Sequence, residues 1–142
     1  MFKDKMNASN WSKGVVILSM LLYFFTIPHI LEDFATGEPA KAGVPAPAIA
    51  LVVSTMFALQ AVGLFWIGRQ RRQGYVIHAI LGIFWPLAAG AAQLPTILSQ
   101  SPYRSGFISV FYVLGIIVIG ILLCLVSVLV LREVKSERET KA

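Results

Sequence analysis

Charged residues are scarce in this chain, and their scarcity excludes most soluble protein classes. Only 13% of the 142 residues are charged, whereas 57% are hydrophobic, and the mean hydropathy is +0.76. Soluble domains are roughly half apolar and about a quarter charged. The length suits one compact domain of four bilayer crossings, since each crossing needs about 20 residues. A separate water-soluble catalytic domain, a Rossmann unit and a barrel are therefore excluded.

Cysteine is limited to a single residue, Cys124. One thiol rules out an internal disulfide, a Cys-x-x-Cys redox motif and a cage of thiolates around a metal. Membrane thiol oxidoreductases need cysteine pairs, so this class is excluded as well. The residues around Cys124 are aliphatic, and we expect its thiol to pack there in the protonated, unreactive form.

Familiar catalytic patterns are also missing. The sequence has no Ser-His-Asp arrangement of workable geometry, no paired-histidine motif and no glycine-rich phosphate loop. Its two histidines, His29 and His78, should differ in depth by on the order of 20 Å, so one haem or metal ion cannot join them. We expect neither haem nor nucleotide. No apolar run carries a charge at its midpoint, which argues against a proton-driven transporter.

The sequence does contain four long apolar runs. They extend from Gly14 to Leu31, Ala46 to Ile67, Tyr75 to Leu98 and Phe107 to Leu131. Each run is apolar on every face, and each has the length that crosses a bilayer, the first only just. We predict an all-α, polytopic integral membrane protein, in which residues 1–142 form one domain built as an up-down bundle of four transmembrane helices.

The first run has one alternative interpretation, a cleaved signal peptide, because a basic segment precedes it and Ala-Lys-Ala follows near residue 42. Pro28 and His29 lie within the run, and Glu32 and Asp33 follow it directly. These residues are unlike a cleavage region, so we predict a transmembrane helix.

Basic residues are distributed unevenly along the chain. Ten of the 12 Lys and Arg residues precede the first run, separate the second from the third, or follow the fourth, whereas Lys41 and Arg104 lie in the other two connections. The positive-inside rule then predicts a multi-pass protein of the cell membrane, with cytoplasmic N- and C-termini. The net charge of +5 therefore indicates topology. Since no aromatic residues are interleaved with a basic stripe, nucleic acid is not an expected partner.

Small residues in the third run indicate where helices approach closely. Gly82, Pro86 and Gly90 are spaced by four, and Gly115 and Gly120 lie in the fourth run. Small residues allow close backbone contact between helices in lipid. We expect the third helix to lie at the centre of the bundle and to bend at Pro86.

The densest polar segment follows the first run, and its structure is open to two interpretations. If the first helix continues through residue 33, His29 shares a face with Glu32 and Asp33, at spacings of three and four. If Pro28 ends that helix, residues 30–35 begin a short surface helix instead. In either case, Gln93 should reach the depth of His29, and the connection beyond it carries two further polar side chains. We predict an outer ligand-binding pocket of His29, Glu32, Asp33, Gln93, Tyr103 and Arg104.

The same segment permits a metal site. Imidazole and carboxylate ligands suit zinc, iron or manganese, so a divalent metal held by His29, Glu32, Asp33 and Glu38 is one interpretation. A second is a hydrated, ion-paired rim, because no second histidine lies at this depth. A third is a site for a substrate or a lipid headgroup.

His78, near the cytoplasmic end of the third run, has Gln60 of the second run as its candidate partner. Buried polar residues in a membrane suggest function, so the pair could relay protons, but a hydrogen-bonded helix clamp explains it equally well.

Two classes of function follow. The first is a non-enzymatic binding or accessory protein with an outer polar pocket, either free-standing, a homo-oligomer or a subunit of a larger membrane complex. The second is a small membrane-embedded enzyme that uses His29 with Glu32 or Asp33 on an amphiphilic substrate, with or without a metal. Because no catalytic constellation is present, we favour the first class.

Overall fold

Five helices make up the described part of the chain. The computed structural model describes the backbone of residues 2–99 and 103–139, and the side chains of residues 10–99 and 103–133. No strand occurs within these ranges. The helices are α1 (Phe2–Ala35), α2 (Glu38–Lys41), α3 (Ala46–Gly68), α4 (Arg72–Leu98) and α5 (Phe107–Glu139).

Four of these helices are long and apolar enough to cross a membrane. The qualifying segments are Asn10–Ala35, Ala46–Gly68, Arg72–Leu98 and Phe107–Glu133. The prediction of an all-helical chain with four helices of spanning length is therefore confirmed. Each helix also extends beyond its apolar run, because polar residues at the ends of a helix can project into water or headgroups without breaking its hydrogen-bond pattern.

Pro28 does not end the first helix. It lies inside α1, which continues to Ala35, and the short helix that follows is α2 at residues 38–41. Of the two interpretations of this segment, the structure therefore has the continuous helix. Gly37 makes the turn between α1 and α2 with φ 71°, a left-handed conformation that glycine adopts without strain.

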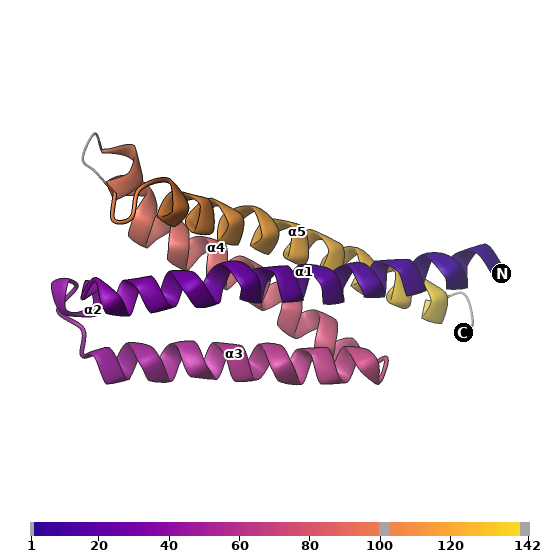
Figure 1. Cartoon of the computed structure of the whole chain (residues 1–142). Helices are drawn as coiled ribbons and strands as arrows, with labels where there is room; N and C mark the ends of the chain where they lie inside the picture. Colours follow the sequence, from indigo (N-terminus) through magenta and orange to yellow (C-terminus); the bar gives the residue numbers. More distant parts are fainter. Residues whose placement is uncertain (1, 100–102, 140–142) are drawn as a thin grey trace.

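The long helices pack in the order α1, α5, α4, α3. Helix α5 lies along both α1 and α4, α4 also packs against α3, and α3 touches α1 only lightly. Figure 1 shows α3 at one side of the molecule, with α4 crossing between it and α5. The start of α1, the α3–α4 connection and the end of α5 lie at the same end.

The crossing of α4 and α5 depends on glycine. A Cβ atom at Gly82 would lie 2.6 Å from the backbone nitrogen of Cys124, and one at Gly120 would lie 2.4 Å from Cγ of Pro86. The helices could not approach this closely with larger residues. Gly90 is different, because a Cβ atom there would meet nothing nearer than 3.6 Å.

The surface of the molecule is strongly apolar. Leu51 of α3 is 70% exposed and Phe107 of α5 is 81% exposed, and many aliphatic side chains on all four long helices are similarly open. A surface of this kind is unfavourable in water over so large an area, and it suits helices that contact lipid.

Candidate functional site: a buried arginine cluster and a buried histidine network

Arg104 is the centre of a polar cluster where α1 and α4 end and α5 begins. Its backbone has φ 39°, a left-handed conformation that is uncommon outside glycine, and its side chain is only 6% exposed. The Nη1 atom donates a hydrogen bond to Oδ1 of Asp33, and Nη2 donates to Oε1 of Gln93 at 2.9 Å. Oε2 of Glu38 lies 3.6 Å from Nη2. The guanidinium therefore joins α1, α2 and α4.

Gln93 has a second partner in the same cluster. The Tyr103 hydroxyl donates to Oε1 of Gln93 at 2.8 Å, and the Arg104 guanidinium lies 5.1 Å from the centre of the Tyr103 ring. Burial raises the pKa of the Tyr103 hydroxyl to about 12, so it stays a neutral donor at physiological pH. The Gln93 carbonyl thus accepts from two donors and is held in a fixed orientation.

His29 lies beside Asp33, one helical turn earlier on α1. Nε2 of His29 is 3.7 Å from Oδ2 of Asp33, and the residue is 3% exposed. Its other ring nitrogen, Nδ1, is buried and has no hydrogen-bond partner among the described residues. With the proton on Nε2 facing the carboxylate, Nδ1 is left as an unused acceptor.

Glu32 joins the end of α1 to the start of α5. Its Oε1 atom accepts a hydrogen bond from the Ser109 hydroxyl, and Ser105 lies beside the same carboxylate. The second oxygen, Oε2, is buried without a hydrogen bond of ordinary geometry to any described residue. Glu32 therefore has hydroxyl neighbours but no ion pair with a described cation.

Glu38 completes the cluster at its exposed edge. Nζ of Lys41 lies 2.8 Å from Oε1 of Glu38, and this hydrogen bond, with the nearby Arg104 charge, lowers the pKa of the Glu38 carboxyl. The cluster then holds three carboxylates, Glu32, Asp33 and Glu38, against two permanent cations. The carboxylates outnumber these cations by one, and Glu32 is the carboxylate without a salt bridge to Arg104 or Lys41.

The metal set suggested by the sequence is not assembled. Residues 29–38 are all described, and no three His, Cys, Asp or Glu side chains within the described ranges lie close enough to hold a metal ion. The physical reason is the guanidinium of Arg104, which occupies the space between Asp33 and Glu38. The described side chains of His29, Glu32, Asp33 and Glu38 therefore form no ready-made group of metal ligands.

The structure brings the other predicted pocket residues together. Asp33, Gln93, Tyr103 and Arg104 are joined by direct hydrogen bonds, and His29 lies beside Asp33. Glu32 faces Ser109 instead. Sequence reasoning missed Ser109, because serine is common at helix starts and its spacing from the acids carries no signal.

A second polar group is buried where α1, α3 and α4 meet, and His78 is its key residue. Nδ1 of His78 lies 2.7 Å from the Gly74 carbonyl, so Nδ1 must carry the proton and Nε2 must accept. Oγ of Ser19 lies 3.1 Å from Nε2 and is therefore the donor. Gln60 Nε2 donates at 2.9 Å both to Ser19 Oγ and to the Ser19 carbonyl.

This His78 network is completely enclosed. Ser19, Gln60 and His78 each have 0% exposure. A Cβ atom at Gly63 would lie 2.6 Å from Cε1 of His78, so only glycine lets α3 approach the imidazole this closely. Gln60 and His78, the predicted pair, do not bond each other directly but share Ser19, which the sequence analysis did not identify. Each N–H or O–H of the network that is named above donates to a partner on another turn or another helix, which favours a helix clamp over a proton relay, although Oε1 of Gln60 is buried without a hydrogen-bond partner among the described residues.

No protein-family model, no curated protein and no solved structure matches this chain. Within its described residues, the fold defines an all-helical protein with four helices long and apolar enough to span a membrane.

Proposed function

We propose that this chain is a small integral membrane protein of the binding or accessory class, with four crossings in up-down order and both termini in the cytoplasm. Nine of the 12 basic residues belong to described segments that meet at one end of the molecule, where α1 starts, α3 turns into α4 and α5 ends (Figure 1). The positive-inside rule assigns that end to the cytoplasm. The Arg104 cluster then lies at the outer membrane surface.

We propose further that the Arg104 cluster binds a ligand carrying a protonated primary or secondary amine. The observation that carries this proposal is His29, a residue 3% exposed whose Nδ1 acceptor has no partner among the described residues. An unused buried acceptor is costly, and a donor from a ligand would satisfy it. Glu32, the carboxylate without a cation, would balance the ligand's positive charge.

The surroundings favour an amphiphilic ligand, whose apolar part would lie along the exposed aliphatic side chains of α1 and α5. A metal ion has less support, because the described residues offer no suitable group of ligands. An enzyme that uses His29 with Asp33 also has less support. Asp33 is already bound by Arg104, so it is poorly placed to act as a free base.

The test measures thermal unfolding of the purified protein in zwitterionic nanodiscs. A long-chain primary alkylammonium ion should raise the unfolding temperature, and its quaternary trimethyl analogue should not, because it has no N–H to donate. The response should be lost in His29→Gln and Glu32→Gln. Glu133→Gln, which removes a carboxylate near the end of α5, is the matched control and should keep it.

Two results would contradict the proposal. One is an equal response to the primary and quaternary amphiphiles. The other is an equal loss of response in the Glu133→Gln control, which would show that only the net charge of the protein matters. A separate experiment, copurification from native membranes, would show whether the chain is a free-standing binding protein or a subunit of a complex.

A further inference from the structure

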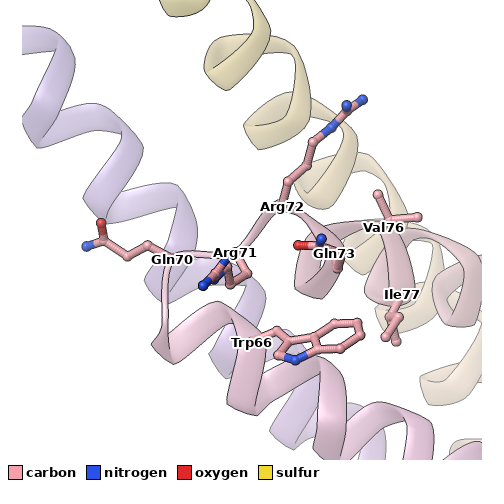
Figure 2. A pocket seen from close by; sticks show the side chains of 7 residues that line it. All are labelled: Trp66, Gln70, Arg71, Arg72, Gln73, Val76 and Ile77. Atoms are coloured by element: carbon pink, nitrogen blue, oxygen red, sulfur yellow. The ribbon is translucent and has the colours of Figure 1, made fainter.

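A groove of about 740 Å³ opens at the other end of the molecule, between the end of α3 and the first turns of α4 (Figure 2). One part of its lining is polar and comes from the α3–α4 connection and the first turn of α4, namely Gln70, Arg71, Arg72 and Gln73. The other part is apolar and comes from the helices, namely Trp66, Val76 and Ile77. A groove with one cationic and one apolar part is complementary to an amphiphile that has an anionic headgroup and a hydrocarbon chain.

The cationic part is not neutralised by the described protein. Arg71 and Arg72 are exposed, and neither forms an ion pair within residues 10–99 and 103–133. Arg69 in the same connection differs, because its guanidinium lies 4.5 Å from the centre of the Phe65 ring and does not line the groove. No side chain caps the start of α4, so the helix dipole adds to the positive potential there.

The arrangement of the side chains suggests which arginine makes the main contact. Figure 2 shows Arg71 and Gln73 on one side of the Trp66 indole, with Ile77 near the far end of the ring. Arg72 and Gln70 extend in opposite directions from the connection. In this view Arg71 therefore lies nearer Trp66 than Arg72 does, and Arg72 extends away from the ring.

We propose that this groove binds one anionic phospholipid, with its phosphate at Arg71 and its glycerol and upper acyl chain along Trp66, Val76 and Ile77. Guanidinium groups bind phosphate oxygens through paired hydrogen bonds. Tryptophan and a basic residue at the end of a spanning helix mark the headgroup depth of a bilayer. Free phosphate would match the cationic part only, because it leaves the apolar part of the groove exposed to water.

This proposal rests on the proposed placement of the helices in a bilayer, and it is independent of ligand binding at the Arg104 cluster. Its test uses the full-length protein in a mild detergent, titrated with phosphatidylglycerol or with phosphatidylcholine, and native mass spectrometry counts the retained lipids. We expect one phosphatidylglycerol to be retained in preference to phosphatidylcholine. A large excess of inorganic phosphate should not displace it.

The variants distinguish a built site from general attraction. Arg71→Gln should weaken phosphatidylglycerol binding by about fivefold, the effect of one cation near an anionic headgroup, and Arg72→Gln should weaken it less. Arg69→Gln removes the same charge from the same connection but not from the groove, and it should keep the wild-type affinity. Glu32→Gln should also keep it, so failure of the outer site and failure of this site are distinguishable.

Three results would overturn the proposal. Equal weakening by Arg69→Gln and Arg71→Gln would show attraction to the whole connection. Equal retention of phosphatidylcholine would show that the phosphate charge is not selected. Displacement by inorganic phosphate would show that the apolar part contributes nothing, and that the groove takes a soluble anion.

Discussion

Ser19 illustrates how one small side chain can join three helices. Its hydroxyl donates to His78 of α4 and accepts from Gln60 of α3, while its own backbone belongs to α1. The depth of Gln60 and His78 could be predicted from the sequence, because each lies a countable number of residues from a helix end. The bridging role of Ser19 could not be predicted from the sequence, because the direction in which each helix face points depends on how the helices pack.

At the scale of single residues, Ser19→Ala should destabilise the protein by about 1–2 kcal/mol. The change removes the hydroxyl that donates to Nε2 of His78 and accepts from Nε2 of Gln60, while the Gln60 amide keeps its bond to the Ser19 carbonyl. Interhelical hydrogen bonds in membrane proteins contribute up to about 1–2 kcal/mol. Reversible unfolding in mixed micelles with increasing SDS measures the free energy of unfolding.

Ser127→Ala is the matched control for this prediction. Ser127 is fully buried in α5, but its hydroxyl has no hydrogen-bond partner among the described residues. Its removal should leave the free energy of unfolding nearly unchanged. A loss at Ser127 as large as that at Ser19 would show that the cost comes from packing volume and not from the network.

The Arg104 cluster shows the same division between what the sequence predicts and what packing decides. Counting residues places Gln93 level with His29, and charge arithmetic requires a cation near Asp33, so convergence with Arg104 could be predicted. The choice of Ser109 as the partner of Glu32 could not, since it depends on the rotation of α5 about its axis. The position of Arg104 between Asp33 and Glu38 could not be predicted either, because composition alone does not show which side chains meet.

At the scale of elements, the contact of α4 with α5 depends on two glycines that face each other across the crossing, Gly82 and Gly120. Their spacing with Pro86 in the sequence predicted close contact, but the sequence could not separate the glycines that touch a neighbour from those that do not. Gly90 follows the same spacing, but a Cβ atom there would make only ordinary van der Waals contacts with Leu94 and Ile117.

Gly82→Ala should therefore destabilise the bundle by roughly 1–3 kcal/mol, because the new methyl group would meet backbone atoms that cannot move aside easily. Gly90→Ala should be neutral or slightly stabilising, since alanine is the better helix former and its methyl group would make only ordinary van der Waals contacts. Unfolding of both variants under the same SDS gradient measures the difference. Equal destabilisation by the two changes would contradict the packing of α4 described above.

At the scale of the whole molecule, four apolar runs and an uneven distribution of basic residues suggest a multi-pass membrane protein. The sequence predicted the number of long helices because twenty-residue apolar segments have few alternatives to crossing a bilayer. It did not predict that α3 would pack at the side of the molecule, against α4 with little contact to α1. That arrangement depends on which glycines and polar side chains meet, and these contacts join residues distant in sequence.

The orientation of the helices in the membrane is the central claim, because it determines that the Arg104 cluster lies outside and that the groove lined by Arg71 and Trp66 lies inside. Single cysteines introduced as Ala42→Cys and Gln73→Cys, in a chain carrying Cys124→Ser, can be labelled in intact cells with a membrane-impermeant maleimide. Both positions are exposed, Ala42 between α2 and α3 and Gln73 in the first turn of α4, at opposite ends of α3. The account predicts labelling of the Ala42→Cys chain from outside, and labelling of the Gln73→Cys chain only after the membrane is permeabilised. External labelling of Gln73→Cys without labelling of Ala42→Cys would contradict it.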